Sequence, residues 1–412
     1  MMTKTTLTVT LLTVASALLA SNTWAATANA STNASTEAVT PIATTITTAV
    51  ATTDASRASV PTDGSLWPRW VEFRTAAVEG GRVIDRSDAR LITTSEGQSY
   101  GMFFALVAND RATLKAIWDW SKTNLCAGDC AKTRVAWLWG ASAPVVGKDA
   151  KDAKDITWGV IDSNNATDAD LWMAYSLLEA AKRWGVESYR TDALALLERV
   201  KADTRVVRGL GRVLLPANVG FEKNGDVVLN PSYYPISLLK GLERVDPFWH
   251  EVRLASLRVL YRSAESGFSP DWVAFGQRWG TRNRDEGSVG SWNAIRVYLW
   301  AGLMSPEDPD AARLKAALRP MLEVTRAAFY TPEDTDTAAN TVSTSGPLAF
   351  SACLLPWLKN DKAGAYIRSG LAQMALTGED YYRSVLALFA MGFDEGRYAF
   401  GEDGSLWLRA QP

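Results

Sequence analysis

The sequence has one histidine, His250, only three cysteines, and no clear excess of acidic or basic side chains. One imidazole cannot serve both as a catalytic base and as part of a multi-histidine metal site, so serine–histidine catalysis and such metal centres are poor candidates. With 43 basic and 45 acidic residues the formal charge is −2, which supplies no cationic field for a nucleic acid. We therefore expect no nucleic-acid partner.

Long apolar stretches are also missing, apart from one near the start. It runs from about Leu7 to Ala20 and is followed by the small residues Thr23 and Ala25. About 14 residues are too few to span a bilayer core of roughly 30 Å, so the pattern predicts a signal peptide at 1–25, cut after Ala25. We expect an exported protein, periplasmic or secreted, with no membrane span after signal removal.

Residues 26–62 are mostly Ala, Thr and Ser, with almost no aromatic or charged side chains. Such a segment cannot bury enough apolar surface to offset its ordering entropy, which predicts a disordered leader. The rest of the chain, residues 63–412, is predicted to form a single folded domain.

The cysteines allow two interpretations. Cys126 and Cys130 lie close enough in sequence to close a small loop as a disulfide in an oxidising compartment. A zinc site would need two further ligands, which Cys353 alone does not supply, and we expect Cys353 to be a buried small hydrophobic residue. No metal ion and no other cofactor is predicted.

Tryptophan is abundant, with 17 residues. Its indole offers a flat stacking surface with a polar N–H group. In a nearly neutral chain with one histidine, this composition favours a carbohydrate or another flat, uncharged ligand.

Helical periodicity dominates after the leader. Apolar residues recur at intervals of three and four in Gln98–Ala108, Leu171–Trp184, Asp192–Val200, Ala294–Leu303, Ala311–Phe329 and Tyr381–Met391. Some stretches are apolar on nearly all sides and must be enclosed, whereas others are amphipathic and should lie outside. About twelve alternating inner and outer helices predict an all-α fold, an (α/α)6 barrel whose inner helix N-termini line a cleft. An irregular helical array is the alternative.

Capping residues and prolines mark where these helices should begin. The marked starts are Thr94-Ser95-Glu96, Thr167-Asp168-Ala169-Asp170, Asn230-Pro231-Ser232, Ser291-Trp292-Asn293, Gly346-Pro347 and Gly378-Glu379-Asp380. A short β-like patch near Val227–Leu229 is expected in a loop. Because parallel inner helices gather their N-termini at one end, polar residues at these starts should converge.

Three carboxylates at the first two predicted starts are candidates for chemistry: Glu96, Asp168 and Asp170. Each has a structural alternative, because an acidic side chain at a helix N-terminus stabilises or caps the helix. Glycines at 97 and 101 would let a bulky ligand approach the backbone beside Glu96. A proton-donating carboxyl group, a second carboxylate and aromatic walls suit glycoside hydrolysis. The candidate sugar platforms are Trp137, Trp139, Tyr233 and Tyr234.

Long, ordered motifs resemble glycoside hydrolase family 8. The two strongest are Ala166–Trp184 and Thr93–Met102. Shorter segments continue the resemblance, which covers essentially everything from Trp67 to about Phe400: Arg82–Arg90, Ala136–Gly140, Asn230–Tyr233, Gly267–Trp272 and Ala294–Tyr298. Within the family, the resemblance is greatest to the periplasmic endoglucanases that accompany bacterial cellulose synthase.

This resemblance implies an (α/α)6 catalytic domain at 63–412, a cellulase that hydrolyses β-1,4-glucan with inversion during bacterial cellulose synthesis. Glu96 would be the general acid, and Asp168 would bind the distorted sugar beside the scissile bond. Arg296, Tyr233 and Tyr381 fall where the family lines its cleft. The implied partners are a β-1,4-glucan chain and the cellulose synthase complex, and the protein is expected to be a monomer.

The chain departs from the family at Asn293, where family cellulases usually carry the aspartate that acts as general base. A neutral amide can position water but cannot accept its proton at useful pH. Three explanations compete: a base on the preceding loop, at Asp285 or Glu286; a slow or inactive enzyme that keeps glucan binding; or a change made to trap substrate. The rival functions are thus a weak or inactive glucan-binding protein, and a family relative acting on chitosan, lichenan or xylan.

Overall fold

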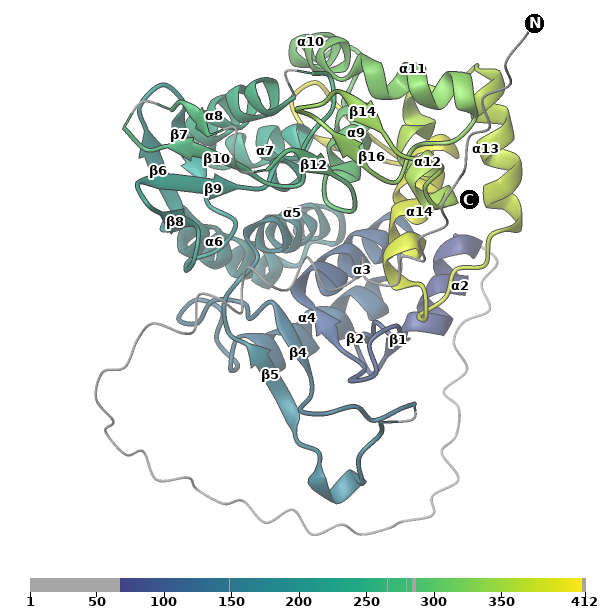
Figure 1. Cartoon of the computed structure of the whole chain (residues 1–412). Helices are drawn as coiled ribbons and strands as arrows, with labels where there is room; N and C mark the ends of the chain where they lie inside the picture. Colours follow the sequence, from purple (N-terminus) through teal and green to yellow (C-terminus); the bar gives the residue numbers. More distant parts are fainter. Residues whose placement is uncertain (1–66, 148, 265, 279, 284–286, 410–412) are drawn as a thin grey trace, which may run out of the picture. The chain divides into compact units, whose positions relative to one another are not determined.

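The structure is a computed structural model, and it describes residues 67–409 except 148, 265, 279 and 284–286 (Figure 1). The described residues belong to a compact unit that spans Asp63–Pro412. The predicted signal peptide (1–25) and leader (26–62) lie outside the described residues.

Helices make up most of the secondary structure of the described chain. The α-helices are α2 (Pro68–Ala77), α3 (Ser95–Val107), α4 (Arg111–Leu125), α5 (Thr167–Trp184), α6 (Glu187–Lys201), α7 (Ile236–Glu243), α8 (Phe248–Ser263), α9 (Ile295–Leu303), α10 (Pro309–Ala317), α11 (Arg319–Ala328), α12 (Leu348–Leu354), α13 (Lys362–Gln373) and α14 (Tyr381–Asp394). Three 3₁₀ helices accompany them: η1 (Ala153–Asp155), η2 (Pro231–Tyr233) and η3 (Leu355–Trp357).

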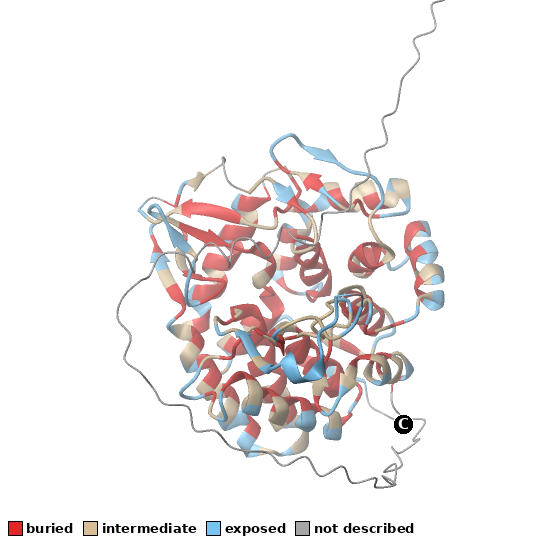
Figure 2. Ribbon diagram, turned by 60° about the horizontal axis from the view of Figure 1, so that its bottom comes forward, coloured by how far each residue is buried: buried red, intermediate tan, exposed pale blue. Residues whose placement is uncertain are grey.

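The predicted division into enclosed and outer helices is confirmed. Every residue of α9 is buried, and so is every residue of α3 except Glu96. In contrast, α4, α6 and α13 bury one face and leave the other to solvent. Figure 2 shows the buried residues concentrated in the inner helices and the exposed ones on the outer helices. Helices without a polar face are stable here because their neighbours cover them on most sides.

Aromatic side chains fill the space where α3, α5, α9 and α14 meet. Phe103 of α3 packs on Trp172 of α5 with ring centroids 5.0 Å apart, and Phe104 packs on Phe389 of α14 at 4.6 Å. Trp300 of α9 contacts the same Phe389 at 5.1 Å. These edge-to-face contacts bury large apolar surfaces, so the four helices are held together by one aromatic centre.

Short strands form six small sheets among the described residues. They are β1 (Val78–Glu79), β2 (Arg82–Val83), β3 (Thr93–Thr94), β4 (Leu138–Ala141), β5 (Trp158–Asp162), β6 (Thr204–Val207), β7 (Gly211–Leu214), β8 (Glu222–Lys223), β9 (Asp226–Leu229), β10 (Val273–Gly276), β11 (Arg282–Asn283), β12 (Val289–Gly290), β13 (Thr335–Asp336), β14 (Thr341–Val342), β15 (Tyr398–Phe400) and β16 (Leu406–Leu408). The predicted β-like patch is confirmed as β9. The all-α prediction therefore holds for the predominance of helices and misses the other strands.

Two predicted helices are wrong in their bounds, and proline explains both. The stretch Ala311–Phe329 is two helices, α10 and α11, because Pro320 lacks an N–H group and its ring clashes with the preceding turn. The motif at Asn230 starts only the 3₁₀ helix η2. Helix α7 begins later, at Ile236, because Pro235 disfavours the helical conformation for the residue before it.

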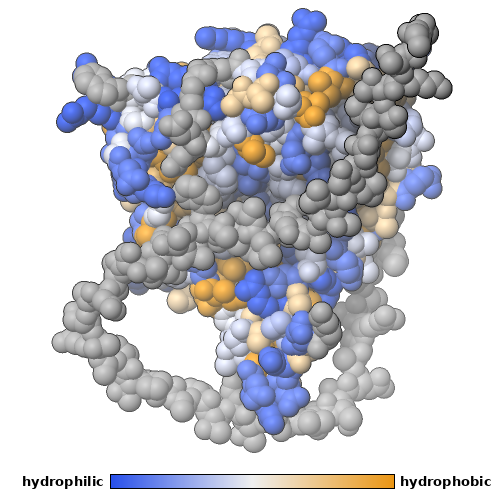
Figure 3. All heavy atoms as spheres, in the orientation of Figure 1, coloured by the Kyte–Doolittle hydropathy of each residue, from blue (hydrophilic) through white to orange (hydrophobic). Residues whose placement is uncertain are grey.

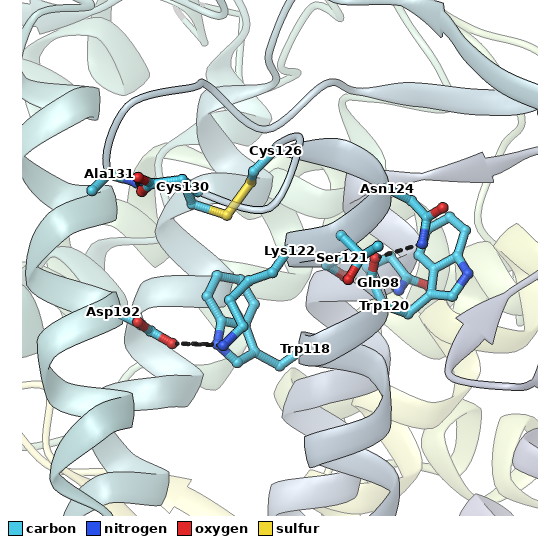
Figure 4. Close-up of a disulfide and its surroundings, with 12 residues drawn as sticks. Gln98, Trp118, Trp120, Ser121, Lys122, Asn124, Cys126, Cys130, Ala131 and Asp192 are labelled. Carbon is cyan, nitrogen blue, oxygen red and sulfur yellow. Dashed lines mark hydrogen bonds and ion pairs between the residues drawn. A yellow bond between two sulfur atoms is a disulfide. The ribbon is translucent and has the colours of Figure 1, made fainter. Parts of the chain in front are cut away.

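The structure joins Cys126 and Cys130 in a disulfide just after α4, the first of the two interpretations (Figure 4). Cys353 is buried, as predicted. In the same region the indole N–H of Trp118, on α4, donates to Asp192 of α6 at 2.7 Å. The disulfide therefore closes the loop after α4, and Trp118 joins the middle of α4 to α6. None of the described helices is both long enough and apolar enough to cross a bilayer.

Candidate active site

Arg296 is the centre of a buried polar cluster at the start of α9. Its side chain is only 3% exposed, and its Nη1 donates to Glu96 Oε2 at 2.6 Å and to Asp168 Oδ2 at 3.1 Å. The same nitrogen lies 3.0 Å from the hydroxyl of Tyr100. Its Nη2 donates to Asn293 Oδ1 at 2.8 Å. One guanidinium therefore brings together residues that begin three separate helices, as the predicted convergence of helix starts requires.

Glu96 lies in the first turn of α3, which Thr94 caps by accepting a hydrogen bond from the backbone N–H of residue 97. Its side chain is 22% exposed, and its Oε1 accepts a hydrogen bond from the Tyr381 hydroxyl at 3.3 Å. Burial raises the pKa of the Glu96 carboxyl, although Arg296 and Tyr381 act in the opposite direction. The result is a carboxyl group that holds its proton to a higher pH than usual while remaining accessible.

The glycines beside Glu96 make room for the protein itself rather than for a ligand. A Cβ at Gly97 would lie 3.1 Å from the Tyr381 hydroxyl, and one at Gly101 would lie 2.9 Å from Val83. The prediction that both glycines admit a ligand is therefore wrong. Gly97 instead allows Tyr381 to reach Glu96.

Asp168 lies in the first turn of α5 and is almost wholly buried, with 3% of its side chain exposed. Burial raises its carboxyl pKa to about 7, against the opposing charge of Arg296. Asp170 points into a different network, where Asn165 Nδ2 donates to its Oδ2 at 2.9 Å. Neither aspartate caps α5, because Ala166 occupies the cap position. The helix-cap alternative is thus wrong for both.

Asn293 is held from two sides. Its Oδ1 accepts hydrogen bonds from Arg296 and, at 3.1 Å, from Asn230 Nδ2. Its backbone N–H donates to Asp271 Oδ1 at 3.0 Å, and the same oxygen accepts from the backbone of Ser291 and Ala294. Asp271 therefore fixes the turn that presents Asn293, a role that a side chain at the helix start itself was expected to fill.

Of the two predicted tyrosine platforms, only Tyr233 lies at the site. Its ring is partly exposed and stands 5.8 Å from the guanidinium carbon of Arg296. Tyr234 is wrong as a platform, because it is 1% exposed and its hydroxyl donates to the backbone carbonyl of Leu214. The ring of Tyr382 also lies at the cluster, 5.9 Å from the guanidinium carbon of Arg296, and its hydroxyl donates to the backbone carbonyl of Trp292.

Of the predicted tryptophans, Trp139 lies in β4 of the three-stranded sheet β3-β4-β5, and Trp137 directly precedes that strand. The backbone carbonyl of Trp137 accepts from Ser95 N–H, and its own N–H donates to Asn164. Trp137 thus links the chain before Glu96 to the chain before Asp168, and its side chain is partly exposed. The ring of Trp139 is flanked by Trp120, with ring centroids 5.2 Å apart.

The remaining predicted site residues, Asp285 and Glu286, lie outside the described residues. Among the residues that are described, no three histidine, cysteine or acidic side chains group as metal ligands would.

Sequence reasoning missed four residues of the cluster: Tyr100, Asn230, Asp271 and Tyr382. Three of them lie inside segments that carry the family resemblance, so the segments were found but the roles were not. Tyr382 is adjacent to the predicted Tyr381. Contacts between segments almost 300 positions apart leave no local sequence signal, since they depend on how the helices pack.

Comparison with known proteins finds related sequences over most of the chain. The sequence model described as glycosyl hydrolases family 8 matches residues 40–396. An endoglucanase of Escherichia coli is 42% identical over 343 residues, covering 82% of this chain and 90% of that protein. An endoglucanase of Pseudomonas fluorescens is 36% identical over 374 residues, covering 83% of this chain and 91% of that protein.

Two solved structures are similar to this chain in fold and sequence. An endo-1,4-D-glucanase from Vibrio fischeri has a TM-score of 0.76 and 39% identity, covering 83% of this chain and 99% of that chain. An endo-beta-1,4-glucanase from Acetobacter xylinum has a TM-score of 0.61 and 25% identity, covering 80% and 98%.

Proposed function

The chain belongs to glycosyl hydrolases family 8, and we propose that this glycoside hydrolase is an inverting endo-β-1,4-glucanase, a cellulase. The observation that carries the proposal is the contact of Arg296 with two carboxyl groups from different helices, the partly exposed Glu96 and the buried Asp168. Similar proteins of Escherichia coli and Vibrio fischeri are described as glucanases, which supports β-1,4-glucan as the substrate. Alternating enclosed and outer helices support an (α/α)6 catalytic domain at residues 63–412.

Glu96 is the general acid in this proposal. Its raised pKa keeps the proton on the carboxyl group until the glycosidic bond breaks, and the proton then passes to the leaving oxygen. The carboxylate that remains is stabilised by the guanidinium of Arg296 at 2.6 Å and by the Tyr381 hydroxyl.

Asp168 binds the distorted sugar beside the scissile bond. An inverting reaction forms no covalent intermediate, so this carboxyl group need not be a nucleophile. With its pKa raised to about 7, Asp168 both donates and accepts hydrogen bonds near neutral pH. Tyr233, Trp137 and Trp139 supply flat surfaces for neighbouring sugars.

The general base comes from the loop that precedes β12, at Asp285, with Glu286 as the second choice. Inversion requires a water molecule on the sugar face opposite the acid, with the two carboxyl groups about 6.5–9.5 Å apart. Asn293 holds Arg296 and Asn230 in place through its side-chain oxygen. It cannot take the proton of the water molecule, because an amide oxygen is not basic.

A second function is favoured by Asn293 itself. If no loop carboxylate reaches the water, the protein binds glucan on the same scaffold and cleaves it weakly or not at all. The contacts of Arg296 with Glu96 and Asp168 support glucan binding whether or not the protein cleaves the chain.

Export and a role in bacterial cellulose synthesis complete the proposal. The N-terminal pattern of a signal peptide and the disulfide Cys126–Cys130 both support a periplasmic or secreted location. N-terminal sequencing of the mature protein tests the cleavage after Ala25. Loss of cellulose yield or altered fibre length in a deletion strain tests the biological role.

The deciding experiment measures reducing ends released from carboxymethylcellulose by the purified protein, with Glu96→Gln as the blank. A fall in viscosity that precedes most sugar release indicates internal cleavage. Proton NMR of the first products reports the anomer and thus the inversion. Parallel assays on chitosan, lichenan and xylan test the other substrates, and faster cleavage of any of these would refute the cellulase assignment.

A further inference from the structure

The hairpin of β4 and β5 extends from the end of the molecule where α3 and α5 begin (Figure 1). It is fastened to both helix starts. Thr93 of β3, which lies three residues before Glu96, pairs with Trp139 of β4. The backbone of Trp137 forms hydrogen bonds with the backbone of both Ser95 and Asn164. The hairpin therefore stands beside the Arg296 cluster as a wall whose base is part of the site.

One face of this wall carries an aromatic stack. Trp139 lies opposite Val160 of β5, and Trp158 lies two residues further along the same face. The rings of Trp139 and Trp158 are stacked, with centroids 5.5 Å apart and planes inclined by 27°. The guanidinium of Arg82 stands 4.5 Å from the first ring and 5.1 Å from the second. Diagonal neighbours across a strand pair are within reach of such large side chains.

The outer ring, that of Trp158, is more exposed than the inner one, that of Trp139, which is half-buried. Trp139 is flanked by Trp120, Trp158 and Arg82, but Trp158 is 46% exposed. Next to it, Gly159 has no neighbouring atom within 4 Å of a Cβ position, so the space beside it is open. Val160 adds a further exposed apolar side chain. Figure 3 shows hydrophobic residues breaking the hydrophilic surface near this hairpin.

The stack holds Trp158 in place without covering it. Arg82 is itself fixed by hydrogen bonds to Thr93 Oγ1, at 2.8 Å, and to the backbone carbonyl of Leu91. An oriented, exposed indole is a surface that loses little conformational entropy when a flat ligand binds. A glucose unit suits this surface, because its ring has an apolar C–H face and polar hydroxyl groups at its edge. The indole offers an apolar face for the first and a polar N–H group for the second.

We propose that Trp158 forms an outer subsite for the β-1,4-glucan chain. The occupant is the part of the chain that continues beyond the sugars at Arg296, because the sheet that bears Trp158 is continuous with the strand leading into Glu96. Strand β5 lies two strand spacings, or about 10 Å, from β3, so Trp158 serves sugars beyond those at the bond that breaks. The subsite rests on the proposed glucanase function, and it makes the enzyme favour long chains.

The test compares kcat/KM for a series of cello-oligosaccharides of increasing length in wild type, Trp158→Ala and Trp158→Tyr. Trp407→Ala is the matched control, because Trp407 is 55% exposed on a different hairpin, β15–β16. We expect Trp158→Ala to lower kcat/KM about three- to tenfold for the longest substrates and to leave the shortest unchanged, the range for loss of one stacking contact. The tyrosine variant should recover most of the loss, and the control should match wild type. Unaltered melting temperatures show that each variant is folded.

A Trp158→Ala enzyme with wild-type kcat/KM at every length would overturn the subsite while leaving the glucanase function intact. An equal loss at every length would overturn it as well, since the platform would then act on the catalytic sugars. If wild type cleaves no glucan, the glucanase proposal fails, and electrophoresis through gels containing hydroxyethylcellulose decides the subsite. Retardation that Trp158→Ala loses and Trp407→Ala keeps supports it; equal retardation of both refutes it.

Discussion

Asp168 and Asp170 differ in their surroundings, although they lie two positions apart at the start of one helix. Both are buried, and burial raises the pKa of each carboxyl group, to about 7 and about 8 respectively. Asp168 faces the guanidinium of Arg296 at 3.1 Å. Asp170 faces an amide, Asn165, which also donates to a second buried carboxylate, Asp203.

The two networks differ in whether a ligand can reach them. The Arg296 network includes the partly exposed Glu96, so a ligand can reach it. The Asn165 network is closed around its carboxyl groups, since Asn165, Asp170 and Asp203 are each at most 3% exposed. Solvent reaches only the outer side of Arg134, a cation that pairs with Asp203 and is 24% exposed. Burial and a raised pKa are therefore not sufficient signs of a catalytic acid; access to a ligand is also required.

The largest expected effect comes from removing the acid. Glu96→Gln keeps the shape of the side chain but has no proton to give, so turnover on carboxymethylcellulose should fall at least about 10²-fold. Glucan binding, measured by retardation in a polysaccharide gel, should survive. Undiminished turnover in this variant would remove Glu96 from the mechanism.

The base gives the next largest effect. We expect Asp285→Asn to lower turnover about 10²-fold, the usual contribution of a placed base, and Asn293→Ala to lower it little. Glu286→Gln and Asn293→Asp, assayed in parallel, identify the alternatives. If the base is missing, Asn293→Asp should instead raise the rate about 10²-fold and both loop variants should match wild type. No change in any of these variants of an active enzyme would refute both accounts.

Much of this site could be predicted from local patterns, and the remainder could not for physical reasons. Thr94, Glu96 and Asp168 stand at helix starts, where capping residues and periodicity give a signal within a few positions. Asp271 fixes the turn before α9 by accepting a hydrogen bond from Ser291, which lies 20 residues later in the sequence. No local sequence pattern predicts such a contact. The two-residue strands escaped prediction because they are too short to show an alternation of buried and exposed side chains.

Replacing each aspartate of α5 in turn tests whether the Arg296 network and the Asn165 network differ in their effect on turnover. Asp168→Asn should lower turnover at least about tenfold, because a group that binds the distorted sugar contributes chiefly in the transition state. Asp170→Asn, the matched control on the same helix, should leave turnover within about twofold, since it lies in the closed network. Equal losses in the two variants would contradict the division between networks.

The same pair predicts how stability depends on pH. The folded-state pKa of Asp170 is raised from 3.8 to about 8, so the folded protein holds a proton that the unfolded chain has released. Stability from this group is therefore full below about pH 4 and is lost as the pH rises towards about 8. Asp170→Asn removes the titration and should raise the free energy of unfolding at pH 8, relative to pH 5, by about 1 kcal/mol or more. Urea unfolding at both pH values measures this difference.

The smallest expected effect is that of a chelator, because neither network has a place for a metal ion. The two carboxyl groups at the site already share the cation Arg296, and a bound metal would have to displace or repel that guanidinium. The histidine of the chain, His250, lies on α8, where its Nδ1 is 2.6 Å from Glu243. EDTA should therefore leave both turnover and melting temperature unchanged. A complete loss of activity that a divalent metal restores would show instead that a cation takes part in the reaction, and the role assigned to Arg296 would then need to be replaced.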